Sequence, residues 1–232
     1  MNIVVVGGGT PGHFGSDFAK RARSEGHTVY VISHSDAYAD EHTTVADFTN
    51  TASVVSAYKS IVEKTGNDVE ILLYNSTADS YPNKVEHFVK HEVDEAAYLQ
   101  TLRLHSIIPH ALALEFNNSG NENSRMIFMA SRSGLMLNRW EENEGLGYAG
   151  GKAFQARLMI AMARINIKGP IYTAVCPDFG YADPKHYPGV FETVYNHVTT
   201  VSWDHNGKIV GIWNPGEINV VERIKLDDLE IY

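Results

Sequence analysis

The sequence contains a single cysteine, Cys176, among its 232 residues. One cysteine excludes a framework of disulfides within the chain and suits a reducing compartment, so we expect a cytoplasmic protein. Cys176 follows a Tyr-Thr-Ala-Val run, which favours a buried core thiol over a nucleophile. No apolar stretch approaches the roughly 20 residues that span a bilayer. The N-terminus shows neither the charged nor the apolar region of a signal peptide.

Basic residues are also scarce. The sequence has 19 Lys and Arg against 28 Asp and Glu, a formal net charge of -9. Such a charge repels nucleic acid and anionic membranes, and no basic cluster counteracts it. We therefore expect no nucleic-acid partner and no membrane partner. His186, His197 and His205 lack ligand-like spacing with Cys or Glu, so we expect no metal.

Short apolar runs alternate with longer helical patterns along the chain. Runs that are apolar on both faces suit parallel strands covered by helices on both sides. This alternation predicts one α/β domain over 1–232, with a doubly wound, mainly parallel sheet in a Rossmann-like three-layer sandwich. The strands are expected at 3–6, 28–32, 69–74, 126–130, 171–176 and 208–213, and the helices at 15–25, 51–65, 94–116 and 148–166.

A glycine-rich turn, GGGTPGHFG at 7–15, follows the first expected strand. Glycines let the backbone approach a pyrophosphate, and the helix that follows offers free N–H groups and the positive end of its dipole. A turn that merely needs positive φ is the alternative. Its place between a strand and a helix favours a dinucleotide cofactor. The expected cofactor contacts here are Gly7, Gly9, Thr10, Gly12, His13, Phe14 and Gly15.

The second strand ends in Ser33 and His34, both expected to contact the cofactor. An acidic residue here would bind the ribose 2′-OH of NAD and repel the 2′-phosphate of NADP. Ser33 takes that place and no Arg or Lys is beside it, so we expect a mild preference for NADP(H) over NAD(H). Asp36 is an alternative contact from the loop. Asp47, followed by Phe48, either accepts the adenine amino group or belongs to a helix N-cap region.

Tyr148 and Lys152 lie four residues apart in the last long expected helix, and therefore on one face. A nearby ammonium lowers the pKa of a phenol, which lets Tyr148 act as general acid in carbonyl reduction and general base in alcohol oxidation. Alone, such a pair is more typical of a partly buried ring beside a solvated amine. Ser131, at the end of a buried strand, favours the catalytic interpretation because its hydroxyl can polarise the substrate oxygen. Ser133 is the rival serine.

With this turn and this pair, residues 1 to about 180 resemble the short-chain dehydrogenase/reductase family. The resemblance implies an NAD(P)(H)-dependent oxidoreductase that interconverts a small-molecule carbonyl and an alcohol. It implies that Ser131 is the catalytic serine and that Lys152 hydrogen-bonds the nicotinamide ribose. It also implies that Asp47 contacts adenine and that Asn75, with Ser76, ends a strand beside the cofactor. Relatives of this kind often form homodimers or homotetramers through their long helices.

The chain departs from the family pattern at three places. The glycine-rich turn has extra glycines and lacks the commonest family spacing. His105 replaces the helix asparagine of the proton relay; it either preserves that role, relays protons itself, or lines the cleft. Pro109, soon after, is expected to bend or interrupt the helix. Pro177-Asp178 replaces the usual Pro-Gly and, with Phe179, is expected near the nicotinamide. These departures keep open a non-catalytic NADP(H)-binding regulator on the same fold, and also an epimerase or dehydratase with bound cofactor.

The C-terminal part resembles little. Residues 179–192 are rich in aromatics and form either a substrate lid or a surface loop that packs its aromatics into the core. Residues 198–203 are expected to finish a helix rather than pair in a hairpin. The tail, 214–232, is a candidate to cover a neighbouring subunit.

Overall fold

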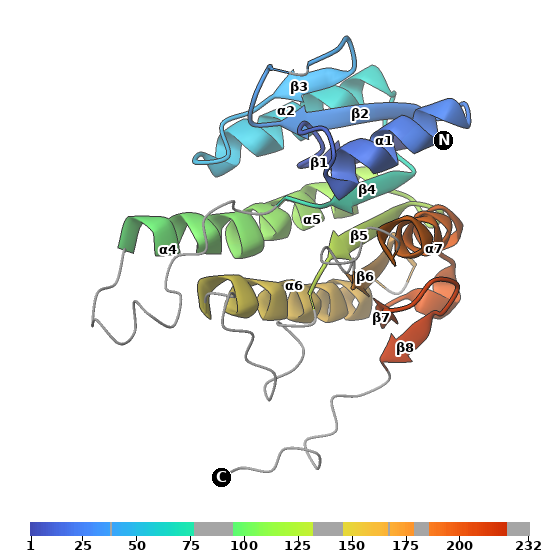
Figure 1. The fold of residues 1–232 in the computed structure, drawn as a ribbon. Coiled ribbons are helices and arrows are strands. Elements are labelled where there is room, and N and C mark those ends of the chain that lie inside the picture. The colour runs from blue at the N-terminus through green and yellow to red at the C-terminus, as the bar shows by residue number, and fades with distance from the viewer. Residues whose placement is uncertain (38, 77–94, 132–145, 167, 179–185, 222–232) are drawn as a thin grey trace.

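The structure, a computed structural model, describes residues 1–37, 39–76, 95–131, 146–166, 168–178 and 186–221. Within these ranges the strands form one eight-stranded sheet in the order β3-β2-β1-β4-β5-β6-β7-β8. Neighbouring strands are parallel, except that β7 and β8 are antiparallel. The predicted doubly wound, mainly parallel α/β sheet is therefore confirmed (Figure 1).

The elements follow the alternation that the sequence predicts. The strands are β1 (Asn2–Val6), β2 (Thr28–Ser33), β3 (Thr43–Val45), β4 (Ile71–Tyr74), β5 (Arg125–Met129), β6 (Ile171–Pro177), β7 (Ile209–Ile212) and β8 (Asn219–Val221). The helices are α1 (Phe14–Ser24), α2 (Thr51–Lys64), α4 (Glu95–Leu102), α5 (Ile108–Ser119), α6 (Leu146–Ile165) and α7 (His186–Thr200). A π-helical turn, η1 (Arg103–Ile107), joins α4 to α5, and a 3-10 turn, η3 (Trp203–His205), follows α7.

Both faces of the sheet are buried. Alternate residues of β1 point to opposite sides: Val4 and Val6 pack in the core under α2, α5 and α6, whereas Ile3 and Val5 pack under α1 and α7. Figure 1 shows these helices as two layers about the sheet. Burial on both sides explains why the strands read as continuous apolar runs.

The order of the strands creates a crevice beside β1. The chain lays β2 and then β3 on one side of β1, and returns to place β4 on the other side. Loops that leave the carboxyl ends of β1 and β4 therefore run in different directions, and such a switch point is where open α/β sheets bind ligands.

The expected helix at 94–116 is interrupted. It consists of α4, the π turn η1 and α5, with Pro109 in the first turn of α5. Proline has no N–H to bond the carbonyl four residues earlier, which belongs to His105, so regular α-helical bonding fails at this point. The predicted interruption is confirmed, and it places the π turn around His105.

The segment expected to be a lid is partly helical. From His186 onward it is α7, in which Phe191 packs against Phe14 with ring centroids 5.7 Å apart, and the Tyr187 hydroxyl donates to Asp17 Oδ2 at 2.9 Å. This part packs its aromatics against α1, and α7 continues to Thr200, as the helical alternative for 198–203 requires. Residues 179–185 lie outside the described residues, so a lid there stays a prediction.

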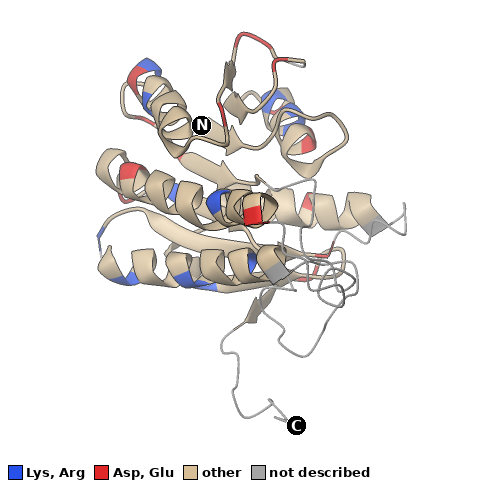
Figure 2. Cartoon of the chain, turned by 90° about the vertical axis from the view of Figure 1, so that its left-hand side faces the viewer, with Lys and Arg blue, Asp and Glu red and all other residues tan. Residues whose placement is uncertain are grey.

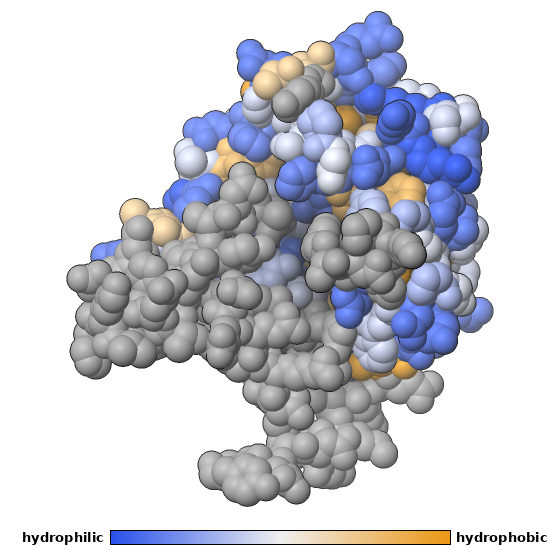
Figure 3. Space-filling view, viewed as in Figure 1, coloured by the Kyte–Doolittle hydropathy of each residue, from blue (hydrophilic) through white to orange (hydrophobic). Residues whose placement is uncertain are grey.

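Part of the tail is regular, because Asn219–Val221 forms the edge strand β8 against β7. Contact of the tail with a neighbouring subunit stays a prediction. Lys, Arg, Asp and Glu are interspersed over α1 and α2 (Figure 2). The surface over α1 is largely hydrophilic (Figure 3). None of the described helices is long and apolar enough to cross a membrane.

Candidate functional site

A pocket of about 110 Å³ lies at the switch point beside β1. Its walls come from the residues that directly follow β1, β2, β3 and β4, because parallel strands bring their carboxyl ends to one edge of the sheet. We call this the strand-end pocket. All of its lining residues are among the predicted cofactor contacts: Gly7, Gly9, Thr10, His13, His34, Phe48, Asn75 and Ser76.

Two contacts hold the walls of the strand-end pocket together. The Asn75 side-chain amide donates to the Gly7 carbonyl at 3.2 Å, which ties the end of β4 to the glycine-rich turn. The His34 ring meets the Phe48 ring nearly at right angles, with centroids 6.4 Å apart. The strand-end pocket is therefore lined both by aromatic rings and by the backbone of the turn.

Ser33 does not face the pocket as the sequence suggests. It is 2% exposed, and its hydroxyl accepts a hydrogen bond from the Ser35 N–H at 3.2 Å. The side chain lies directly beneath Gly9, where an added Cβ would overlap Ser33 Oγ and Cβ. Ser33 thus supports the turn from below, and the exposed His34 takes the place in the wall of the pocket.

The remaining predicted cofactor residues of this half have various surroundings. Gly12 is exposed on the turn, whereas Gly15 is buried and the Phe14 side chain belongs to the core between α1 and α7. Asp47 is exposed, and its Oδ1 accepts from the Thr49 N–H at 2.8 Å and the Thr49 hydroxyl at 2.7 Å. These bonds hold the pKa of Asp47 below its ordinary value. The N-cap of α2 is Asn50, so Asp47 forms the turn that precedes the cap.

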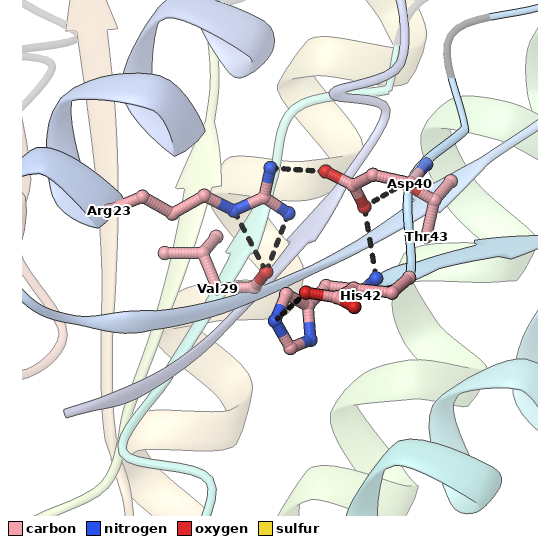
Figure 4. Close-up of polar contacts among 6 residues, drawn as sticks. Arg23, Val29, Asp40, His42 and Thr43 are labelled. Carbon is pink, nitrogen blue, oxygen red and sulfur yellow. Dashed lines mark hydrogen bonds and ion pairs between the residues drawn. The ribbon is translucent and has the colours of Figure 1, made fainter.

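The loop after His34 is anchored to α1 by a surface network (Figure 4). Arg23 Nη1 contacts Asp40 Oδ2 at 2.6 Å, and Asp40 Oδ1 accepts from the Thr43 hydroxyl at 2.7 Å. Beside it, a cavity of about 320 Å³ reaches the outer side of the turn at Gly9 and includes Lys20 and Arg23. The sequence analysis considered only cations adjacent to Ser33 in the chain. It therefore missed Lys20 and Arg23, which are earlier in the sequence but lie near the turn because they are on α1.

A second group of polar side chains lies between α6, η1 and the sheet, with Tyr148 half-buried and the others buried. We call His105, Tyr148, Lys152 and Gln155 the buried polar cluster. Lys152 is 3% exposed, and its Nζ donates to the Met129 carbonyl at 2.6 Å and to Gln155 Oε1 at 3.4 Å. The same nitrogen lies 5.6 Å from the centroid of the Tyr148 ring. The His105 ring is perpendicular to that of Tyr148, with centroids 5.3 Å apart.

Burial sets the charges in the cluster. It lowers the pKa of Lys152 to about 7. Burial, followed by the Lys152 charge, holds the pKa of His105 well below its ordinary value, so His105 is neutral at physiological pH. Cys176 is fully buried, as expected, and burial raises the pKa of its thiol to about 12. The predicted pair, Tyr148 and Lys152, is therefore together with His105 in one place of low polarity.

The π turn and a glycine allow α6 to approach His105. A Cβ at Gly151 would overlap the His105 Cβ, so only glycine permits this contact. From the sheet, the Tyr74 hydroxyl donates to the Leu104 carbonyl within η1. Single π turns inside α-helices are frequent at functional sites, and this one aims His105 at Tyr148 and Gln155.

Comparison with known proteins identifies the fold. No protein-family model matches the sequence, and no curated protein matches it significantly. Among solved structures, a short-chain dehydrogenase/reductase from Serratia marcescens is 19% identical, with 91% of this chain and 95% of that chain covered and a TM-score of 0.72. A short-chain dehydrogenase from Leptospira borgpetersenii with bound NAD+ is 16% identical, with coverage of 93% and 91% and a TM-score of 0.73. A Brucella ovis oxidoreductase of the same family, in complex with partially ordered NAD, is 19% identical, with coverage of 91% and 99% and a TM-score of 0.68.

The chain has the short-chain dehydrogenase/reductase fold. In this fold the carboxyl ends of β5 and β6 share the edge at which the strand-end pocket lies. Ser131 is half-buried two residues beyond β5, Pro177 ends β6, and the Asp178 N–H donates to the Ile212 carbonyl at 2.9 Å. Ser133 and Phe179 lie outside the described residues.

Gln155 is a residue of the buried polar cluster that the sequence analysis did not single out. It lies three residues after Lys152, hence on the same face of α6, and it is fully buried. The sequence did contain a sign of this residue, because a glutamine is unusual on the side of the α6 helix that otherwise faces the core. Metal-ligand groups of three or more His, Cys, Asp or Glu are not found within the described ranges, and the expectation of no metal stays a prediction.

Proposed function

We propose that the protein is an NAD(P)(H)-dependent oxidoreductase that interconverts a small-molecule carbonyl and an alcohol. The observation that carries this proposal is one sheet edge with both required parts. The strand-end pocket is lined throughout by residues predicted to hold a dinucleotide, and Tyr148 and Lys152 lie together near the end of β5. The NAD named for the Leptospira and Brucella structures supports a nicotinamide cofactor.

The residues divide the chemistry among them. Tyr148 gives its proton to the carbonyl oxygen in reduction and takes it back in oxidation. The Lys152 charge near the Tyr148 ring favours the phenolate, and the Ser131 hydroxyl holds the substrate oxygen. Bound nicotinamide supplies or accepts the hydride at the carbonyl carbon. Glycines of the turn and Asn75 hold the dinucleotide, with His34 and Phe48 beside the adenosine.

Three finer features belong to the same proposal. A mild preference for NADP(H) is supported by the end of β2, where the pocket wall is formed by His34 and not by an acidic residue, and by Lys20 near the turn. A cytoplasmic location is supported by the single, buried cysteine. Homodimers or homotetramers are supported by exposed apolar side chains along α4, η1, α5 and α6, namely Leu99, Ile107, Leu114 and Phe154.

The assembly has a direct test. Phe154, 40% exposed on α6, is expected to lie in a contact between subunits, whereas Ile165, 73% exposed at the end of the same helix, is expected to lie outside it. Light scattering after size exclusion should show that Phe154→Glu dissociates the assembly and that Ile165→Glu does not. A monomeric wild type would contradict the proposed assembly.

A second function, a non-catalytic NADP(H)-binding regulator, is favoured by one observation. Lys152 turns inward, and its Nζ is bound to the Met129 carbonyl and to Gln155. A lysine held there is a poor partner for a nicotinamide ribose unless its side chain moves when cofactor binds. The two functions share the strand-end pocket and differ only in turnover.

The deciding experiment measures binding and turnover separately. NADPH and NADH are titrated by fluorescence into wild type and Tyr148→Phe, and oxidation of the bound cofactor is then followed over a mixed panel of carbonyl compounds. We expect both proteins to bind cofactor and wild type alone to turn over, with a loss of at least about 100-fold in the variant. Cofactor that co-purifies with the protein would point instead to an epimerase or dehydratase.

Two outcomes contradict the proposal. Binding without turnover by either protein would favour the regulator. Absence of binding would show that the glycine-rich turn does not hold a dinucleotide, and the oxidoreductase and regulator proposals would both fail.

A further inference from the structure

The contacts of the buried polar cluster have a fixed direction. Lys152 Nζ donates to Gln155 Oε1 at 3.4 Å, and Gln155 Nε2 lies 3.4 Å from His105 Nδ1. An amide nitrogen can only donate, so Nδ1 must be the accepting nitrogen of the imidazole. A neutral imidazole carries one proton, and the proton of His105 is therefore on Nε2.

Nε2 of His105 is the end of this chain of contacts. The side chain is 0% exposed, and Nε2 is buried without a hydrogen-bond partner among the described residues. The ring of Tyr148 lies perpendicular to it at 5.3 Å between centroids. One buried amide thus connects the lysine beside Tyr148 to a histidine that also packs on Tyr148.

A glutamine at this buried position would lower the stability of the fold if its only role were packing. Its neighbours on the same buried side of α6 include Ala156 and Met159, and an amide without partners in such surroundings is destabilising. Each half of the Gln155 amide has a partner of matching polarity, an ammonium donor for the oxygen and an imidazole acceptor for the nitrogen. Because its two ends have different partners, the Gln155 amide has one preferred orientation between Lys152 and His105.

We infer that Gln155 is a positioning residue for the proposed oxidoreductase reaction: its amide holds His105 in the Nε2–H tautomer and holds Lys152 beside Tyr148. The inference rests on the proposed function for its role in turnover, whereas the bridge itself does not. Gln155 is not proposed to touch substrate or cofactor.

The titratable groups around the bridge come from four elements. Tyr148 and Lys152 are on α6, His105 is on η1, Cys176 is on β6, and Tyr98 of α4 contacts the start of α6 at Gly147. The Cys176 thiol is protonated at neutral pH because burial raises its pKa. Changes at position 155 therefore act chiefly on the protonation of Lys152 and His105.

The first test reads the tautomer directly. Nitrogen-15 NMR of histidine-labelled protein distinguishes protonated from unprotonated ring nitrogens, and the His105→Asn variant assigns the signal. We expect the Nε2–H form in wild type. Gln155→Leu removes the donor and should give a mixture, whereas Gln155→Glu supplies an acceptor and should give the Nδ1–H form. A wild-type His105 in the Nδ1–H form, or a tautomer indifferent to both substitutions, would overturn the bridge.

The second test reads the lysine through the pH dependence of turnover. Gln155→Leu removes an acceptor that favours the Lys152 ammonium, so the alkaline fall in kcat should move to lower pH. Gln155→Glu adds a negative charge that favours the ammonium, and the fall should move to higher pH, each by about one unit. Opposite shifts are not expected from a residue that only packs, and shifts of one sign or none would refute the positioning role.

A matched control separates these effects from a general loss of buried polarity. Ser124 is also buried, and its hydroxyl donates to the Val69 carbonyl at 3.1 Å, at the opposite end of the strands. Ser124→Ala should leave the tautomer and the pH profile unchanged. The tautomer needs no turnover, so it decides the bridge even if wild type oxidises no cofactor, in which case the proposed function has failed and not the bridge.

Discussion

The strand-end pocket and the buried polar cluster lie at one edge of the sheet but are built differently. The pocket is made by residues that directly follow strands, and much of its wall is backbone of the turn at Gly7 and Gly9. The cluster is made by long side chains from α6 and η1, all buried or half-buried, whose directions depend on packing and hydrogen bonds. The position of the pocket follows from the order of the strands, whereas the geometry of the cluster follows from the packing and hydrogen bonds of buried side chains.

This difference predicts how each region responds to change. A site made of turns tolerates polar substitutions but not added volume, because the backbone itself is the wall. Buried polar groups destabilise the fold, and a protein that keeps them at a functional site does so because the chemistry of the site requires them.

Lys152→Met is expected to stabilise the fold while it abolishes turnover. Burial lowers the pKa of Lys152 to about 7, against about 10.4 for an unfolded lysine. Below pH 7 both states hold the proton and the wild type bears the whole cost. Between these values the unfolded chain binds more protons, so wild-type stability rises with pH and the advantage of the variant shrinks. We expect a gain on the order of 3 kcal/mol at pH 6, after the lost hydrogen bonds are counted.

Urea unfolding at pH 6 and pH 9.5 measures this effect. Lys59→Met is the control, because Lys59 is largely exposed and pairs with Glu115 at 2.9 Å; its substitution should show no such dependence on pH. A Lys152→Met protein that is no more stable than wild type at either pH would mean that the cluster stabilises the ammonium fully.

Gly151→Ala tests the close approach of α6 to η1. An added Cβ would overlap the His105 Cβ, and overpacking of this kind costs about 1–3 kcal/mol. Gly150 is the matched control, since no described atom lies within 4 Å of a Cβ built there and the residue is exposed. Gly150→Ala should stabilise the helix by up to about 1 kcal/mol. Thermal unfolding of both variants decides, and equal behaviour would contradict the packing described for His105.

The strand-end pocket was foreseeable from the sequence to a degree that the cluster was not. Motif and strand end together locate Gly7, His34 and Asn75, because the carboxyl ends of parallel strands must meet. The inward turn of Ser33 was not foreseeable, since it depends on the space under Gly9. The role of Gln155 was not foreseeable either, because it depends on a contact with His105, which lies far away in the sequence on η1. Patterns predict backbone placement well and side-chain partners poorly.

Gly9→Ala tests the wall of the strand-end pocket. The added Cβ would meet Ser33, so the turn must shift, and we expect affinity for NADPH to fall at least about tenfold, or about 1.4 kcal/mol. Ser33→Gly in the same protein removes the opposing Cβ and hydroxyl and should restore most of the affinity. Fluorescence titration of the single and double variants measures this. If the double variant binds NADPH as weakly as the single variant, the contact between Gly9 and Ser33 does not determine the position of the turn.

Asp40→Asn is expected to have the smallest effect, because it alters only the surface anchor of the loop behind His34 (Figure 4). Burial alone would raise the pKa of Asp40, but the Thr43 hydroxyl and the Arg23 charge together hold it below its ordinary value. Its contribution is therefore present above the ordinary pKa of an aspartate and is lost as the pH falls through the lower folded value. An exposed pair of this kind is worth about 0.2–1 kcal/mol and is screened by salt.

Thermal unfolding of Asp40→Asn at pH 7 should show a slight loss of stability that disappears in 1 M salt, whereas Asp36→Asn, in the same loop, should show none. A loss of cofactor affinity greater than the loss of stability would mean that this loop, and not the turn alone, shapes the strand-end pocket.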